Sequence, residues 1–283
     1  MFVSNAVHHR PNVMTQSVTN IAAYHFTDLT DLPVWRERVL SQTTALELKG
    51  TVLLAHEGIN LFLAGSKDGI ETFLSWLREL APFAGLKVKY SESDEVPFKR
   101  LKVKIKNEII RMNHPAIHPA EGRAPAVEPA TLRRWLQAGQ DDAGRPVVML
   151  DTRNDFEVQA GTFKDAINWH IERFTQFPEA VQEHMNELEG KTVVSFCTGG
   201  IRCEKAAIYM QEIGVKNIYQ LDGGILQYFE DTDGYGFEGN CFVFDERETL
   251  DTDLHEAHLD GQSLGDQVEE GKREGNVGEG NES

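Results

Sequence analysis

The second half of the chain alternates short apolar segments with segments of helical periodicity, and this alternation restricts the fold more than any other feature. Each apolar segment is short and continuous, as in a strand that is buried on both faces. The predicted strands cover residues 146–150, 192–196 and 217–221, and the predicted helices cover residues 130–138, 178–188, 203–213 and 225–229. This order predicts an α/β domain with a mainly parallel sheet, whose functional groups gather at the carboxyl ends of the strands.

One junction between a strand and a helix carries a cysteine in a glycine turn, Cys197-Thr-Gly-Gly-Ile-Arg202. Unpaired N–H groups at a helix N-terminus stabilise anions and lower the pKa of a thiol. We therefore predict that Cys197 is a nucleophile or sulfur carrier. The predicted anion cradle consists of Thr198, Gly199, Gly200, Ile201 and Arg202. The alternative, a cysteine that only packs in the core, leaves the glycine pair and the arginine unexplained.

Two aspartates lie at the same end of the predicted sheet. Asp151 follows the strand 146–150 and precedes Arg153 by two positions, and Asp222 follows the strand 217–221. We expect all three side chains to support the active loop. Asp151 and Arg153 act either as an ion pair that braces the loop or as its direct ligands.

The chain has three cysteines, an odd and small number that argues against a disulfide scaffold and for a reducing compartment. Cys203 is either a second thiol that attacks an oxidised or persulfidated Cys197, or a packing residue at the start of the helix. Cys241 alternates with aromatic residues and is predicted to be buried in a strand. No apolar run is long enough for a membrane span and no signal peptide is recognisable, which predicts a cytoplasmic protein.

The first half of the chain begins with the order β-α-β-β-α-β, and one further strand follows it. Strands are predicted at residues 21–26, 50–56, 59–64, 86–90 and 98–110, and helices at residues 28–48 and 69–80. This order is that of a ferredoxin-like (split βαβ) domain.

One strand of this domain alternates apolar and basic residues. Leu101, Val103 and Ile105 are expected on one face. The opposite face then carries Arg100, Lys102, Lys104 and Lys106. Its positive charges lie about 6–7 Å apart, which suits a nucleic-acid backbone. The alternative is an ordinary edge strand protected by lysines. Lys205, near the cysteine loop, is predicted to extend this RNA-binding face.

Charge and composition divide the chain into five parts. We expect a flexible leader over residues 1–19, the ferredoxin-like domain over 20–112, a proline-rich linker over 113–124, the parallel-sheet domain over 125–244 and an acidic, disordered tail over 245–283. The net charge is −17, but the tail alone holds 13 acidic and 3 basic residues. The total charge therefore does not argue against a local RNA-binding face. No metal-ligand spacing is convincing, so no bound metal is predicted.

The second domain resembles the rhodanese family. The resemblance rests on Asp151-x-Arg153, the segment 161–168, the loop Cys197–Arg202 and Leu221-Asp-Gly-Gly224. It implies a doubly wound, five-stranded parallel sheet and a cysteine that carries sulfur as a persulfide. Related phosphatases have one more residue between cysteine and arginine. Rhodaneses usually place a tryptophan where this chain has Tyr228.

The whole chain resembles a narrower family, the bacterial oxygen-dependent tRNA uridine(34) hydroxylases with a central rhodanese domain. The resemblance rests on Glu57-Gly-Ile-Asn60, the basic strand, the run Cys197–Ala206 and Cys241-Phe-Val-Phe-Asp-Glu-Arg247. It implies an oxidoreductase that converts the wobble uridine in the anticodon region of tRNA to 5-hydroxyuridine. O2 and an unidentified electron donor are the implied co-substrates, and no bound cofactor is predicted.

Three functions are open at this stage. The first is hydroxylation, for which attack of Cys197 on C6 of uracil is one hypothesis. The second is a sulfurtransferase that carries sulfane sulfur as a Cys197 persulfide. The third is a non-catalytic RNA-binding adaptor whose loop senses the redox state.

Overall fold

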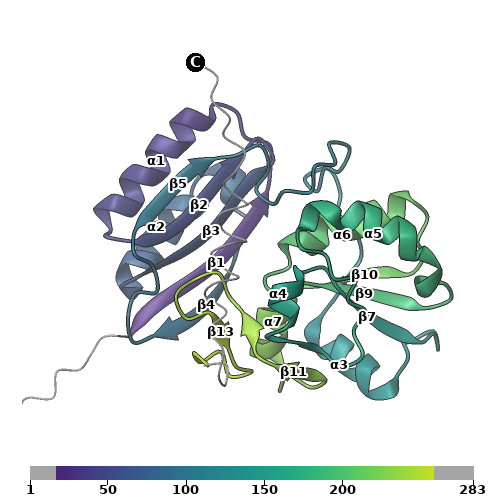
Figure 1. The fold of residues 1–283 in the computed structure, drawn as a ribbon. Coiled ribbons are helices and arrows are strands. Elements are labelled where there is room, and N and C mark those ends of the chain that lie inside the picture. Colours follow the sequence, from purple (N-terminus) through teal and green to yellow (C-terminus); the bar gives the residue numbers. More distant parts are fainter. Residues whose placement is uncertain (1–16, 258–283) are drawn as a thin grey trace, which may run out of the picture.

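The computed structural model describes residues 17–257, which form two α/β domains (Figure 1). The first domain contains β1 (Val18–Phe26), α1 (Leu32–Ala45), β2 (Lys49–Ala55), β3 (Gly58–Gly65), α2 (Lys67–Arg78), β4 (Lys87–Ser93) and β5 (Leu101–Ile105). Its sheet has the order β4-β1-β3-β2-β5. All neighbouring strands are antiparallel except β5, which runs parallel to β2 at the edge. The ferredoxin-like prediction is confirmed, with β5 as an added edge strand.

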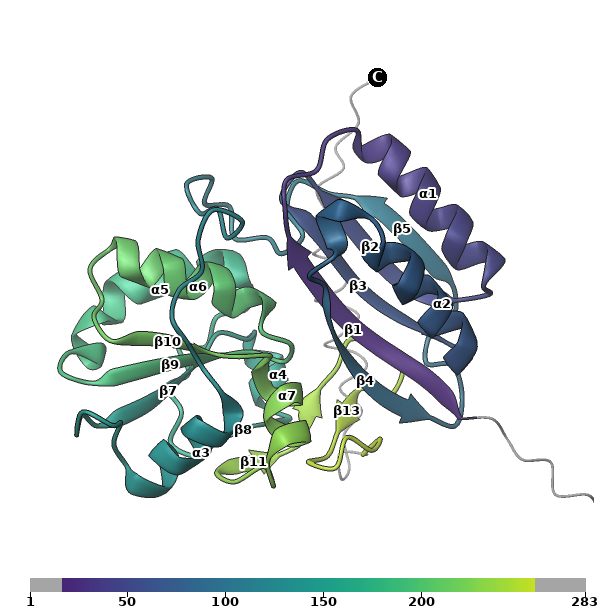
Figure 2. The ribbon, with the colours of Figure 1, turned by 180° about the vertical axis from the view of Figure 1, so that it is seen from behind.

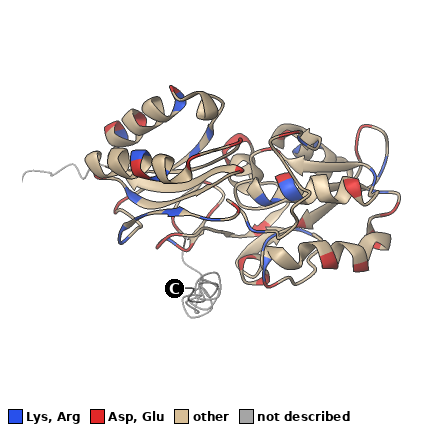
Figure 3. Cartoon of the chain, turned by 90° about the horizontal axis from the view of Figure 1, so that it is seen from above, with Lys and Arg blue, Asp and Glu red and all other residues tan. Residues whose placement is uncertain are grey.

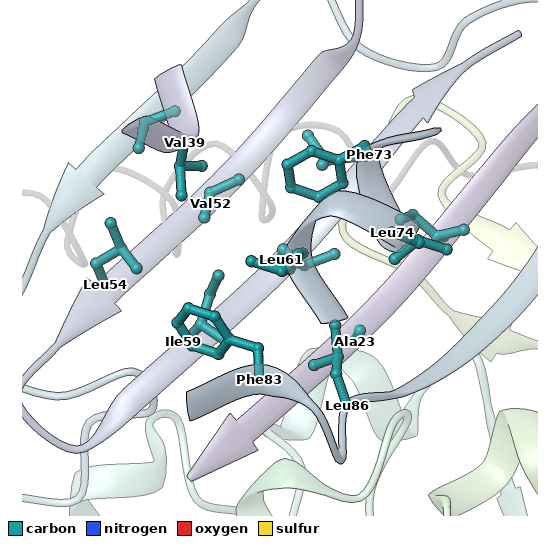
Figure 4. Close-up of a cluster of buried hydrophobic side chains, with 14 of the residues drawn as sticks. Ala23, Val39, Val52, Leu54, Ile59, Leu61, Phe73, Leu74, Phe83 and Leu86 are labelled. Carbon is teal, nitrogen blue, oxygen red and sulfur yellow. The ribbon is translucent and has the colours of Figure 1, made fainter. Parts of the chain in front are cut away.

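Both helices of the first domain cover one face of this sheet. Alternate strand residues such as Val52, Leu61 and Ala23 point to this face and pack against Val39 of α1 and Phe73 of α2 (Figure 4). The helix α2 begins where the side chain of Ser66 accepts a hydrogen bond from the backbone of Gly69. The opposite face of the sheet has no helix and is turned towards the second domain (Figure 2).

The second domain has a parallel sheet of order β6-β10-β9-β7. Its strands are β6 (Ala126–Val127), β7 (Val147–Asp151), β9 (Thr192–Phe196) and β10 (Ile218–Leu221). Its α-helices are α3 (Pro129–Ala138), α4 (Asp155–Val158), α5 (Phe177–His184), α6 (Ile201–Glu212) and α7 (Gly224–Asp231). α5 and α6 cover one face, and α3 and α7 cover the other. The rhodanese-like, doubly wound arrangement is therefore confirmed.

The expected fifth parallel strand is reduced to a single bridge between Leu150 and Ile167. Two antiparallel pairs were not predicted, because strands of two or three residues are too short for periodicity to reveal them. They join β8 (Gly161–Phe163) to β11 (Phe237–Gly239), and β12 (Cys241–Phe242) to β13 (Thr249–Leu250). Short 3-10 helices cover Ala81–Phe83, Phe174–Gln176 and Met185–Leu188. No helix among residues 17–257 has the length and apolar character needed to cross a membrane.

The acidic tail was predicted to begin too early. Residues 245–257 fold back onto the protein, since β13 pairs with β12, which buries Cys241 as predicted. Arg247 forms an ion pair with Asp245 and donates a hydrogen bond to Ser91 of β4, at 2.8 Å. The predicted leader also ends sooner, because β1 begins at Val18. The rest of the leader and tail lies outside the described residues.

Lys205 joins the two domains, so its prediction as an RNA-binding residue is wrong. Its side chain is 2% exposed, and its ammonium lies 2.8 Å from a carboxylate oxygen of Glu57 and 2.6 Å from one of Glu108. It also donates a hydrogen bond to the carbonyl of Ile110, at 3.0 Å. Burial would raise the pKa of Glu108, but the hydrogen bonds from Lys205 and from the backbone lower it. A cation paired in this way is not available to phosphate.

We predict that Lys205→Met lowers the free energy of unfolding by about 3 kcal/mol, because it leaves two half-buried carboxylates without their buried cation. Urea denaturation followed by circular dichroism measures this change. The exposed Lys216 of the same domain provides the control, since Lys216→Met should change stability by less than about 0.5 kcal/mol. Equal stability of the two variants would contradict the structural role of Lys205.

Candidate active site

Cys197 lies between the end of β9 and the first turn of α6. Its thiol is almost completely buried, with 1% of the residue exposed. The backbone N–H of Gly200 donates a hydrogen bond to its sulfur, with 3.1 Å between N and Sγ. Gly200 has a φ of 95°, a left-handed conformation that favours glycine, and it precedes the first helical residue. The turn therefore directs helix N-terminal amides at the sulfur.

These surroundings favour the thiolate of Cys197. Burial alone would raise the pKa of the thiol, but the hydrogen bond from Cys203, the charge of Arg202 and the backbone N–H groups of both residues lower it to about 5. Burial and the negative charge on Cys197 raise the pKa of Cys203 well above its usual range. Cys203 is thus a neutral donor beside an anion, and its sulfur also lies 3.7 Å from the hydroxyl of Thr152.

A second glycine turn supports the loop from behind. The backbone N–H groups of Ile225 and Leu226 donate to the carbonyls of Cys197 and Thr198, at 3.0 and 3.1 Å. A Cβ on Gly224 would lie 2.4 Å from the carbonyl oxygen of Cys197, and the φ of Gly224 is +70°. Only glycine fits this close approach, which explains the glycine pair after β10.

Arg202 makes a buried ion pair with Glu157 of α4. Its two terminal nitrogens lie 2.5 and 2.7 Å from the two carboxylate oxygens. The arginine thus contributes charge to the site, but its hydrogen-bonding fork is occupied by a protein carboxylate. Sequence analysis missed Glu157. The pattern Asn154-x-x-Glu157, in which the Asn154 N–H donates to Glu157 at 3.1 Å, was the available signal for a capped helix there.

In the described part of the chain, the hydrogen bonds and ion pairs of the Asp151, Arg153 and Asp222 side chains go to partners outside the loop. Asp151 and Arg153 form a fully buried ion pair at 2.6 Å, and Arg153 donates to the carbonyl of Gly161. The pair therefore braces β7 against β8. Asp222 binds Arg123 of the linker at 2.8 Å and Lys87 of β4 at 3.3 Å. Of the two alternatives for Asp151 and Arg153, the described residues show the ion pair and no direct hydrogen bond to the loop, which is held by backbone groups and by Arg202 with its partner Glu157.

A cavity of about 1250 Å³ opens between the loop and the helix-free face of the first sheet. Cys197, Thr198, Gly199, Ile201 and Arg202 form its wall on the side of the second domain. The first domain contributes residues from β1, β2, β3 and β4. The aromatic residues of the lining are Tyr24, Phe62, Tyr90, Phe98, Phe156, Phe174 and Phe244. The sulfur is thus reached from a space that both domains enclose.

The basic strand belongs to the same sheet face. Lys104 pairs in register with Leu53, which lines the cavity, and Lys106 lines it directly. Lys102 shares the face of Lys104, and Arg100 is exposed just before β5. Ile105 is 39% exposed, at the last position of this edge strand. Figure 3 shows the distribution of Lys and Arg over the ribbon.

One group of potential metal ligands occurs among the described residues, at Asp251, Asp253 and His255. The carboxylate of Asp251 already accepts backbone hydrogen bonds from the other two residues, at 3.0 and 2.9 Å. The group therefore has the geometry of a turn closed by an aspartate side chain.

Two family models match the chain. The model of the UPF0176 acylphosphatase like domain matches residues 18–109, and that of the rhodanese-like domain matches residues 129–231. Among solved structures, a rhodanese-related protein from Thermoplasma volcanium is 25% identical, with a TM-score of 0.31, and the match covers 40% of this chain and 97% of that chain.

Curated relatives match both domains together. The tRNA uridine(34) hydroxylase of Bordetella petrii is 69% identical over 238 residues, which cover 84% of this chain and 94% of that protein. The tRNA uridine(34) hydroxylase of Delftia acidovorans is 59% identical over 237 residues, which cover 84% of this chain and 90% of that protein. Identity at this level, with both domains present in order, shows that the chain belongs to the tRNA uridine(34) hydroxylase family.

Proposed function

We propose that this protein hydroxylates uridine 34 of tRNA to 5-hydroxyuridine, with Cys197 as the group that engages the uracil ring. The observation that carries the proposal is a cysteine with a lowered pKa at the wall of a cavity between the two domains. The name shared by the relatives supplies the substrate, since they are tRNA uridine(34) hydroxylases.

The size and lining of the cavity suit a nucleoside that has left the anticodon stack. Enzymes that modify a base commonly take it out of its stack into a pocket and hold it between aromatic side chains. Phe156 and Phe244 both line the cavity, and their rings meet edge to face, with centroids 6.4 Å apart and planes at 87°. Phe244 is 38% exposed, so its ring is accessible to an entering base.

The lysine face supports an RNA backbone at the cavity. Lys104 and Lys106 lie on the sheet face that contributes to the cavity wall. Successive same-face residues of a strand are about 6–7 Å apart, a spacing that suits phosphates of single-stranded RNA. The proposed anticodon loop lies along β5 and places its wobble base between the domains.

The proposed chemistry starts with addition of the Cys197 thiolate to C6 of uracil, which makes C5 electron-rich. O2 then forms a bond to C5 and yields a C5 hydroperoxide after taking up a proton. A donor of two electrons, together with two protons, reduces this hydroperoxide to a C5 hydroxyl and water. Loss of the C5 proton and departure of the thiolate restore the C5–C6 double bond. One oxygen atom thus enters the base and the other leaves as water.

Transfer of sulfane sulfur is the competing function, because the loop from Cys197 to Arg202 has the length found in sulfur-handling rhodaneses. A Cys197 persulfide would keep the same amide cradle. Thiosulfate-to-cyanide turnover in the purified protein, without any change in tRNA nucleosides, would favour it over hydroxylation.

We predict that Cys197→Ala abolishes 5-hydroxyuridine and its derivatives in tRNA, because no other group at the cavity wall replaces the thiolate. The variant is expressed in a bacterial strain without its own tRNA hydroxylases, and tRNA nucleosides are measured by mass spectrometry. Cys241→Ala, at a buried cysteine of β12 outside the cavity lining, is the matched control and retains the modification. Unchanged 5-hydroxyuridine with Cys197→Ala would refute the role of this cysteine.

We predict that tRNA carrying 5-fluorouridine at position 34 forms a covalent adduct with Cys197 in the presence of O2 and reductant. Once C5 carries both fluorine and oxygen, it has no proton to lose, so the thioether at C6 persists. Digestion followed by mass spectrometry locates the nucleotide on the peptide that contains residue 197. Cys197→Ala gives the background, and the absence of an adduct on the unmodified cysteine would count against attack at C6.

We predict that Lys104→Gln with Lys106→Gln weakens tRNA binding and reduces the slope of log affinity against log salt concentration by about one per lysine. Filter binding at a series of salt concentrations measures both quantities. Lys67→Gln is the control, because Lys67 is an exposed residue at the start of α2, on the helix-covered side. Equal slopes for all three proteins would show that β5 is only a protected edge strand.

A further inference from the structure

Lys89 is a buried lysine that the first domain inserts into the site. It lies on β4, on the sheet face without helices, and it is only 9% exposed. Its ammonium donates a hydrogen bond to the carbonyl of Gly199, with 3.0 Å between Nζ and oxygen. It lines the same cavity as Cys197 and lies 5.8 Å from the ring centroid of Tyr24.

The bonded carbonyl belongs to the peptide group whose N–H reaches the catalytic sulfur. The carbonyl of Gly199 and the N–H of Gly200 share one planar peptide, and in a trans peptide they point in opposite directions. Lys89 binds the oxygen on one side, and the N–H on the other side donates to Cys197 at 3.1 Å. Fixing the oxygen therefore fixes the orientation of the N–H.

The local sequence does not hold this peptide by itself. Glycines flank it on both sides, and glycine is free to adopt conformations that other residues avoid. No atom outside the adjoining residues lies within 4 Å of the position of a Cβ on Gly199. A reversal of the peptide would point a carbonyl oxygen at the thiolate in place of an N–H. The hydrogen bond from the other domain opposes this reversal.

The charges around the sulfur are consistent with such a role. Arg202 and Cys203 face Cys197 from α6, Tyr24 faces it from β1 and Lys89 from β4. Burial lowers the pKa of Lys89, whereas negative charges on Cys197, Asp222 and Glu230 raise it and Lys87 lowers it. Because the fork of Arg202 is bound to Glu157, Lys89 supplies a second cation from a different domain.

We propose that Lys89 is a positioning residue for Cys197: its ammonium orients the Gly199–Gly200 peptide and so makes thiolate reactivity depend on docking of the first domain. The consequence of this Lys89 contact for catalysis rests on the proposed hydroxylase function. The effect of Lys89 on the reactivity of the Cys197 thiol can be tested without tRNA.

The test is the rate of alkylation of Cys197 by iodoacetamide in the full chain as a function of pH, read by peptide mass spectrometry. In the unmodified protein the rate falls with a midpoint near pH 5, because the thiolate is protonated below its pKa of about 5. We expect Lys89→Met to move this midpoint upward by about one unit. Lys89→Arg keeps a cation and N–H donors, so its midpoint should return most of the way to that of the unmodified protein.

Lys87→Met is the matched control. Lys87 lies on the same strand and also bridges to the second domain through Asp222, but its side chain is 77% exposed. The alkylation midpoint of the Lys87→Met variant should equal that of the unmodified protein. If Lys89→Met does not give folded protein, Lys89→Gln, which removes the charge, is judged by the same criterion.

The inference is overturned if the Lys89→Met midpoint equals that of Lys87→Met, or if Lys89→Arg shifts as far as Lys89→Met. Failure of the proposed function would look different. In that case the Lys89→Met midpoint would move as expected, while Cys197→Ala would leave 5-hydroxyuridine in tRNA unchanged.

Discussion

A buried thiolate is the constraint on which the rest of the structure depends. An anion removed from water is costly unless N–H groups and cations surround it, and each unit by which its pKa is lowered corresponds to about 1.4 kcal/mol. Around Cys197 these groups come from the first turn of α6, from Cys203 and from Arg202. Glu157 then compensates the arginine, and Gly224 allows the second turn to approach the loop. The need to stabilise the thiolate thus explains Arg202, and the need to compensate Arg202 explains Glu157.

The candidate site lies at the interface between the two domains. Lys205 of α6 is anchored by Glu57 and Glu108, on the side of the first domain. In the opposite direction, Tyr24 of β1 donates to the buried Glu204 of α6, at 3.0 Å. Two buried residues of α6 thus depend on partners that the first domain supplies. This contact places the open sheet face opposite the cysteine, and both line the cavity.

Sequence predicted the elements with strong periodicity and missed those without it. The strand predicted at residues 192–196 matches β9, and the helix α6 begins two residues before its predicted start. A buried strand and an amphipathic helix each leave a repeated signal over several residues. The short strands β6, β8, β11 and β13 leave no such signal, because each is only two or three residues long, whereas β12 was indicated only by the aromatic alternation at Cys241. The ordered segment 245–257 was likewise hidden by its acidic composition.

The sequence by itself determined those chemical groups of the site that come from residues adjacent in the chain. The Cys197 loop, the glycine turn after β10 and the lysines of β5 are all readable, because the residues of each motif are neighbours in the chain. Only the tertiary structure decided which charged side chains remain free to bind a ligand and which are already paired within the protein. Lys205 and Lys89 look like any surface lysine in sequence, yet one is buried between two carboxylates and the other on a loop carbonyl. The availability of a cation depends on its partners and on its distance from water, and both are set by segments that lie far apart in the chain.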